Sequence, residues 1–157
     1  MNLDLKIAAN PSIADAAMAE FHEKFLKDVL PLLMEAVANI VVSNIESKMH
    51  SYQPSAEAIE AWPVLEDISA FISVLSSTVK VKSDKAGVYV VADPKEMLNQ
   101  GMDPLWIARA EEGSSLTPAF YMWDSAAKLF ASNPALANAI LQESLEKIVM
   151  SKYVNEV

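Results

Sequence analysis

The residues able to do acid–base or metal chemistry are few and scattered in this sequence. The 157-residue chain holds two histidines, His22 and His50, and no cysteine. His22-Glu23 begins like a zinc-protease motif, but Leu26 stands where the second ligand is required. Without cysteine, the common structural zinc sites and all disulfides are excluded. We therefore predict no metal ligand and no cofactor, and we interpret both histidines as surface residues.

Paired carboxylates and paired serines are the other candidates for catalysis. Adjacent carboxylates occur at Glu66-Asp67 and Glu111-Glu112. Because neighbouring helical residues point about 100° apart, neither pair suits an acid–base dyad, and we interpret them as caps or solvated faces. Ser76-Ser77 and Ser114-Ser115 lack the glycine context of a nucleophile elbow. We therefore predict that the chain is not an enzyme.

The charge balance argues against ordinary nucleic-acid binding. The chain has 12 basic and 21 acidic side chains and a formal charge of −9, whereas phosphate binding needs clustered Lys and Arg. Arg109 is the only arginine. Lys80, Lys82 and Lys85 form the one basic cluster, which we interpret as a solvated or edge-protecting strand face. A phosphate contact is the alternative reading of that cluster.

The hydrophobic pattern of the N-terminal half predicts helices and a hairpin. Residues 3–7 alternate with a period of two, which is typical of a short strand. Helical spacing covers residues 16–25 and 32–48, with a kink or short break at Pro31. A helical stripe follows over 55–75. Residues 78–83 and 87–92 predict a β-hairpin, in which the run of residues 88–91 is largely buried.

The C-terminal half reads as helices that begin at prolines. Short helices are predicted over 94–98 and 105–110, and longer ones over 118–130 and 134–151. The fold class is therefore α+β: a long N-terminal helix and C-terminal helices packed on a small, mainly antiparallel β-sheet. We predict one domain, 1–157, with a frayed tail at 151–157.

The hydropathy of the chain bears on where the protein resides. The longest nearly uncharged apolar run, residues 36–45, is far short of the ~20 residues that a spanning helix needs. The N-terminus is too short and too charged for a signal peptide. These features predict a soluble protein made in the cytoplasm, without a membrane partner. The positive mean hydropathy, +0.19, suggests apolar surface buried between subunits, although an all-helical core gives a similar average.

Four aromatic residues follow one another closely in the predicted helix that opens at Pro118. They are Phe120, Tyr121, Trp123 and Phe130. They cannot all face one way on a helix. Core packing is one reading, and a place for Tyr121 and Trp123 at a subunit interface is the other.

The order of these elements, together with one motif, resembles a known family. Residues 106–115 read Trp-Ile-Ala-Arg-Ala-Glu-Glu-Gly-Ser-Ser, and Pro118-Ala119-Phe120-Tyr121-Met122 and Ala126 follow. This stretch is similar to the tail-completion, or head–tail joining (neck), proteins of tailed bacteriophages. Trp106 stands where the family often has Tyr, Ser114 replaces the usual Thr, and the Gly-x-Leu that often precedes the hairpin is absent.

The motif also has a physical reading of its own. Gly113 lets the chain turn sharply with a positive φ. Ser114, Ser115 or Thr117 can cap a helix that begins at Pro118. Glu111 ties the loop or meets a neighbouring subunit. The motif therefore predicts shape and assembly, not catalysis.

The resemblance implies a virion structural protein. It implies a ring, often a hexamer, whose partners are the head–tail connector and the tail-terminator or tube proteins. DNA would be only a passing cargo, and an acidic lumen would let it slide. The candidate subunit-interface residues are Lys80, Lys82, Tyr89, Glu111, Gly113, Phe120, Tyr121 and Trp123. Two alternatives stay open: another phage tail or baseplate subunit, and an acidic helical adaptor or regulatory module.

Overall fold

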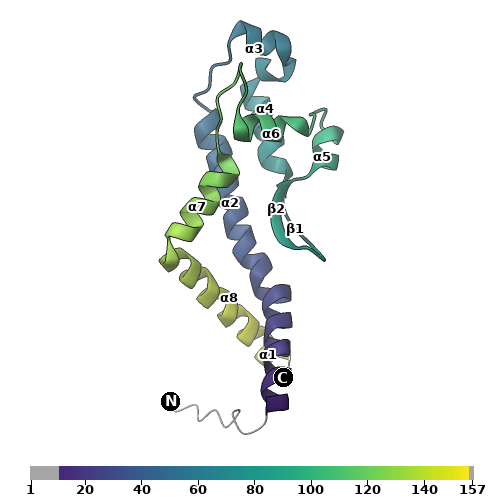
Figure 1. The fold of residues 1–157 in the computed structure, drawn as a ribbon, viewed down its shortest axis with the longest axis vertical. Helices are drawn as coiled ribbons and strands as arrows, with labels where there is room; N and C mark the ends of the chain where they lie inside the picture. The colour runs from purple at the N-terminus through teal and green to yellow at the C-terminus, as the bar shows by residue number, and fades with distance from the viewer. Residues whose placement is uncertain (1–10, 156–157) are drawn as a thin grey trace.

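A single long rod dominates the molecule. The computed structural model describes residues 11–155. The rod consists of α1 (Pro11–Lys24), the π-helical turn η2 (Phe25–Val29) and α2 (Leu30–Met49). Figure 1 shows these elements running on from one another along the length of the molecule. The strand predicted over residues 3–7 lies outside the described residues.

The helix accommodates Pro31 without ending there. Proline has no N–H, and its ring crowds the carbonyl group four residues earlier. The π-helical turn lies just before it, and there the N–H of Leu30 bonds the carbonyl of Phe25, five residues back. Because such a turn holds one extra residue, the helix adjusts locally and continues. Of the two outcomes predicted at Pro31, the structure therefore has the continuous helix with a local distortion.

The core lies around the second half of α2. The shorter helices packed there are α3 (Ala56–Ala61), η3 (Pro63–Glu66), α4 (Ile68–Thr78), α5 (Pro94–Asn99) and α6 (Leu105–Glu112). Val41 and Ile45 of the predicted α2 stripe are fully buried. The indole ring of Trp106 stands edge-on to two other aromatic rings. Its centroid lies 5.1 Å from that of Trp62 and 5.8 Å from that of Phe71. The core is thus helical and aromatic.

The helical stripe predicted over 55–75 is three helices in the structure. Ser55 caps α3 by accepting from the N–H of Ala58. Pro63 then begins the 3₁₀ turn η3. The carboxylate of Asp67 caps α4 by accepting from the N–H of Ala70 at 2.9 Å. The predicted apolar positions do face the core, but the helix is interrupted at Pro63 and starts again after the cap at Asp67.

The hairpin forms where the sequence predicts it. β1 (Val79–Asp84) pairs antiparallel with β2 (Gly87–Ala92), and Val81 lies opposite Val90. The expectation that residues 88–91 are largely buried is wrong. All four are only partly buried, and Ala92 is the buried residue of β2. The reason is that a two-stranded ribbon packs one face on the helices and leaves the other open.

The last two helices fold back along the rod. α7 (Met122–Ser132) and α8 (Pro134–Asn155) meet at an angle, and α8 returns to contact η2 and α2 (Figure 1). The prediction that a helix opens at Pro118 is wrong by four residues. The tail predicted to fray from residue 151 is helical to Asn155.

Together these elements make the predicted α+β fold. It has a long N-terminal helix, a small antiparallel sheet and C-terminal helices. Among residues 11–155, none of the helices combines the length and the apolar character that crossing a membrane requires.

Candidate functional site

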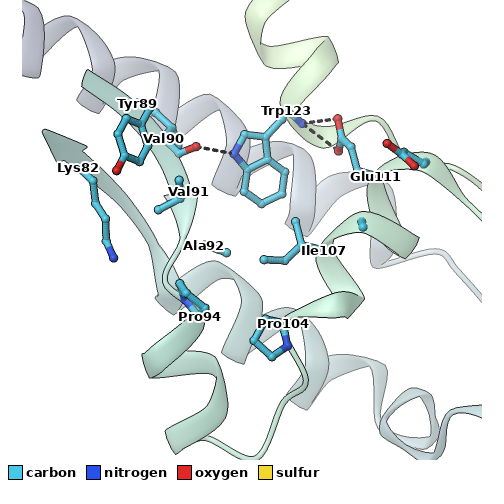
Figure 2. A pocket seen from close by; sticks show the side chains of 12 residues that line it. Lys82, Tyr89, Val90, Val91, Ala92, Pro94, Pro104, Ile107, Glu111 and Trp123 are labelled. Carbon is cyan, nitrogen blue, oxygen red and sulfur yellow. Dashed lines mark hydrogen bonds between the residues drawn. The ribbon is translucent and has the colours of Figure 1, made fainter. Parts of the chain in front are cut away.

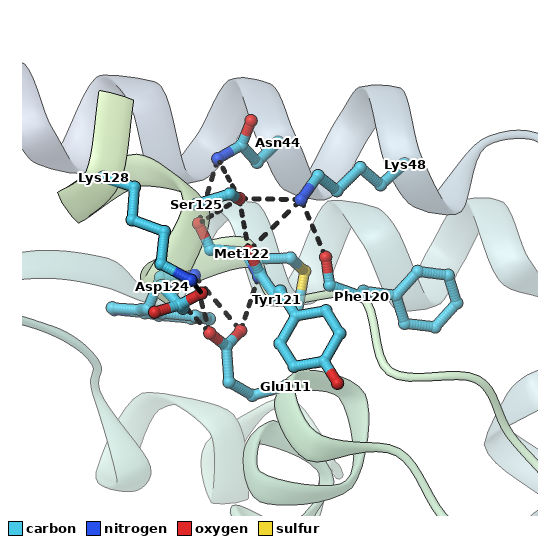
Figure 3. A network of polar contacts seen from close by, with 10 residues as sticks. Asn44, Lys48, Glu111, Phe120, Tyr121, Met122, Asp124, Ser125 and Lys128 are labelled. Carbon is cyan, nitrogen blue, oxygen red and sulfur yellow. Dashed lines mark hydrogen bonds and ion pairs between the residues drawn. The ribbon is translucent and has the colours of Figure 1, made fainter. Parts of the chain in front are cut away.

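The carboxylate of Glu111 caps helix α7, which begins eleven residues later in the chain. The N–H groups of Met122 and Asp124 donate to its oxygens at 2.6 and 2.8 Å, and the N–H of Trp123 donates at 3.1 Å (Figure 3). The first N–H groups of a helix have no partner within the helix, and a negative charge there is favourable. The residue before α7, Tyr121, provides no side-chain cap. Glu111 therefore supplies the N-terminal cap of α7, which the residues next to the helix do not provide.

The backbone between α6 and α7 is also fixed by direct pairing. The N–H of Phe120 donates to the carbonyl of Ala110 at 2.8 Å, and that of Tyr121 donates to the carbonyl of Glu111 at 3.2 Å. Tyr121 has left-handed backbone angles, φ 49° and ψ 48°. A non-glycine residue in that region is uncommon and costs roughly 1–2 kcal/mol. The surrounding bonds hold it there.

Gly113 makes the turn out of α6, as predicted. Its φ is 79° and its ψ is 178°, a combination that is essentially confined to glycine. A Cβ atom at this position would lie 2.7 Å from the backbone nitrogen of Ala119. The glycine is therefore required both by its angles and by the close approach of the returning chain.

Ser114 and Thr117 close the loop and do not cap α7. The N–H of Ser114 donates to the carbonyl of Thr117 at 2.8 Å, and the two hydroxyl oxygens lie 2.9 Å apart. Thr117 is buried. The predicted capping by Ser114, Ser115 or Thr117 is thus wrong, because the helix begins only at Met122. Of the two roles predicted for Glu111, the structure shows the tie to the loop.

Helix α2 binds the same junction from the other side. Lys48 Nζ donates to the carbonyl of Phe120 at 2.8 Å and to Ser125 Oγ at 2.7 Å. Asn44 Nδ2 donates to the carbonyl of Met122 at 2.9 Å. Figure 3 shows these side chains reaching from α2 into the start of α7. The sequence did not identify this network, although a polar Asn44 within an apolar stripe was the available signal.

The aromatic cluster divides between interior and surface. Phe120 meets Tyr52 edge-on, with centroids 5.3 Å apart. The indole N–H of Trp123 donates to the carbonyl of Val90 in β2 at 3.1 Å. Tyr121 remains 53% exposed. Of the predicted interface residues in this cluster, Tyr121 is therefore the one whose side chain is most available to a partner.

A groove of about 630 Å³ lies between the hairpin and α6, with Trp123 at one end (Figure 2). Its volume is in the range of ligand and peptide sites. Most of the lining is apolar. Four of the predicted interface residues line it: Lys82, Tyr89, Glu111 and Trp123.

Two of the three hairpin lysines are paired with carboxylates of the same chain, and so is Tyr89. Lys82 Nζ lies 2.9 Å from Asp93 Oδ2, and this hydrogen bond lowers the pKa of Asp93. Lys80 forms an ion pair with Glu96. The phenol of Tyr89 donates to Asp84 at 2.6 Å, which raises the pKa of Tyr89 and lowers that of Asp84. Lys80 and Lys82 thus form short-range pairs with carboxylates, as on a solvated strand face.

The remaining candidate groups are placed as surface or packing residues. His22 and His50 are exposed, as expected. Within the described part of the chain, no three His, Asp or Glu side chains are grouped closely enough to hold a metal ion. The guanidinium of Arg109 lies 4.9 Å from the ring centroid of Trp62 and 5.5 Å from that of Trp106. This cation–π stack was not predicted.

The chain was compared with known proteins by sequence and by fold. No family model, no curated protein and no solved structure matches it.

Proposed function

We propose that this chain is a non-enzymatic structural subunit of a bacteriophage virion, a tail-completion or neck protein. Its copies would form a ring, with a hexamer as the first symmetry to test, between the head-side connector and the tail. The proposal rests on the resemblance of residues 106–122 to that family. The observation that supports it is the use of this motif in the fold, where Glu111 and Gly113 position α7 against α2.

Exposed apolar side chains also support a role in assembly. Large apolar side chains are exposed on three helices: Leu98 of α5 (62%), Leu105 of α6 (61%) and Leu129 of α7 (49%), with Tyr121 just before α7. Exposed apolar side chains of this size are candidates for subunit contacts. The groove beside the hairpin adds a concave surface to them. A ring would place such surfaces against neighbouring copies.

The charge of the chain suits a conduit that does not bind DNA. A formal charge of −9 repels phosphates. DNA would pass through the ring without being held by it. The neighbours in the particle would be the head–tail connector and the tail-terminator or tube proteins.

Mass photometry and negative-stain imaging of the purified chain test the proposal. We expect a closed ring of one stoichiometry and binding to purified connector or tail-tube protein. An adaptor or regulatory module would instead give a monomer or dimer with one preferred partner. Single chains at every concentration, together with no binding to either phage component, would contradict the proposal.

A further inference from the structure

The outer edge of β1 carries backbone groups that face away from β2. The two strands are joined by a two-residue turn, Lys85-Ala86, between the paired residues Asp84 and Gly87. In such a hairpin the closing pair exchanges hydrogen bonds, and hydrogen-bonded and non-bonded pairs then alternate. Val81 and Val90 form a non-bonded pair in this register. The N–H and C=O of Val81 therefore point outward, away from β2.

Two hydrogen bonds agree with this assignment. The carbonyl of Val90 accepts from the indole of Trp123, so it points away from β1. The N–H of Asp93 donates to the carbonyl of Thr78 at 2.7 Å. These two residues face each other at the base of the hairpin, where the alternation of pairs requires a hydrogen-bonded pair. In Figure 2, β2 with Val90 lies between Trp123 and the strand that carries Lys82. Trp123 thus covers part of the free edge of β2, and the free edge of β1 is the outer edge of the sheet.

No group among the described residues pairs with the outer edge of β1 at Val81 or Ser83. Beside this edge is a hollow of about 380 Å³, lined by Glu35, Ala38 and Asn39 of α2 together with residues 79–81. An isolated two-stranded sheet is marginal, and an unpaired edge favours the addition of another strand. The unpaired edge and the hollow beside it together leave room for a third strand.

The sequence holds a segment with the matching pattern. Leu3, Leu5 and Ile7 alternate with Asn2, Asp4 and Lys6. As a strand beside β1, this segment would place its apolar row next to Val79 and Val81, on the side that packs on α2. Its polar row would join Lys80, Lys82 and their carboxylate partners. The period-two alternation is the one a half-buried third strand requires.

The length of the rod decides which copy supplies the segment. From Pro11 to Glu35 the chain runs 24 residues along a helix, which is about 36 Å at 1.5 Å per residue. Residues 8–10 with the link to Pro11 span at most about 14 Å when fully extended. Ile7, the end of the segment nearer to Pro11, therefore falls short of the hollow on its own chain by about 20 Å, so residues 2–7 cannot all lie beside β1 of that chain. This limit on reach does not apply to β1 of a second copy.

We propose that residues 2–7 of one copy add as a third strand to the outer edge of β1 in the next copy. This inference rests on the self-association in the proposed function, and it gives that association a mechanism. The donating and accepting surfaces differ, so the contact is head-to-tail, which is the kind that closes into a ring. The partner is thus a second copy of this chain.

Cysteine cross-linking tests the proposal, since the natural chain has no cysteine. Chains carrying Ser83→Cys are mixed with chains carrying Leu3→Cys, Leu5→Cys or Ile7→Cys and then oxidised. The matched control is Asp4→Cys, which lies in the same segment but on the opposite face of the strand. We expect one of the three apolar positions to give about tenfold more mixed dimer than Asp4→Cys, because a disulfide needs Cβ atoms that face each other.

A second measurement uses Leu5→Asp, which puts a charge in the apolar row. We expect mass photometry to show a shift of this variant from the ring towards single chains. Rings that persist, with no cross-link at residues 3, 5 or 7 above the Asp4→Cys control, would overturn strand addition and leave the ring itself standing. Single chains at all concentrations of the natural protein would overturn both. A cross-link confined within one chain, in the double variant L5C/S83C, would overturn the exchange between copies.

Discussion

At Gly113 the backbone angles and the nearby backbone of Ala119 both require a residue without a Cβ atom. We expect Gly113→Ala to lower the free energy of unfolding by about 2–3 kcal/mol, because the methyl group meets Ala119 and φ is positive. Gly101→Ala is the matched control. Its φ is 77°, close to the 79° of Gly113, but nothing lies within 4 Å of its Cβ position. We expect about 1 kcal/mol there. Equal losses in urea unfolding would contradict the role of the close approach.

Glu111 acts on a helix to which it does not belong. We expect Glu111→Ala to lower the free energy of unfolding by about 1–2 kcal/mol, as for the loss of a helix cap. Glu111→Gln should fall between that variant and the natural chain, since one oxygen remains to accept. Glu112→Ala, at the exposed neighbour, is the control. If E112A unfolds at the same urea concentration as E111A, the cap is not what stabilises α7.

The pair of Lys82 and Asp93 gives the hairpin a dependence on pH. A carboxyl group whose pKa is lowered by folding adds stability that is fully present above its unfolded pKa, about 3.9, and is lost as the pH falls through its folded pKa. We expect Lys82→Met to raise the pKa of Asp93, because the hydrogen bond from Lys82 is its main cause. The variant should be less stable at neutral pH and converge on the natural chain in acid.

An NMR titration of the Asp93 carboxyl group, alongside urea unfolding, measures both effects. Lys85→Met is the control, since Lys85 has no ion pair among the described residues. An unchanged Asp93 pKa in K82M would show that the capping bonds to Lys95 and Glu96 dominate instead.

At the scale of elements, Trp123 joins α7 to the hairpin. Trp123→Phe keeps a ring in the groove but removes the hydrogen bond to the carbonyl of Val90, worth about 1 kcal/mol. We expect faster hydrogen exchange across residues 87–92 with little change in α4. Trp62→Phe, which leaves this contact intact, should not have that effect. Uniformly faster exchange in both variants would indicate a global loss of stability.

Local signals predicted some elements closely and misplaced one. The hairpin and the short helices at prolines were evident because turn and cap chemistry depends on adjacent residues, whereas the division of the 55–75 stripe at Pro63 and Asp67 was not predicted. The start of α7 was not. Pro118 is a good first helical residue by local rules, but the backbone of Phe120 and Tyr121 pairs with α6 instead. Tertiary hydrogen bonds overrode the local preference.

At the scale of the whole molecule, charge opposes association. Each copy carries a formal charge of −9, and salt screens repulsion over distances beyond about 10 Å at 0.1 M ionic strength. We therefore expect the concentration at which the proposed rings dissociate to fall severalfold when salt is raised towards 0.5 M. Mass photometry across a salt series measures this. Weaker assembly at high salt would show that opposite charges, and not apolar contacts, hold the copies together.

Local patterns in the sequence were sufficient to predict the class of the fold. The helix periods, the alternation of the hairpin and the proline and cap positions are local properties, and they required α+β with a long first helix. It also indicated Gly113 as a turn with positive φ, since the glycine stands alone between two helical patterns.

How those elements meet depends on packing between distant parts of the chain. It made Glu111 a cap, turned Lys48 and Asn44 towards the start of α7, and placed Phe120 and Trp123 in contacts that leave Tyr121 outside. Each of these depends on residues ten to eighty positions apart in the chain. The physical reason is that a hydrogen-bond donor or acceptor takes whatever partner packing brings within reach, and sequence spacing does not record that.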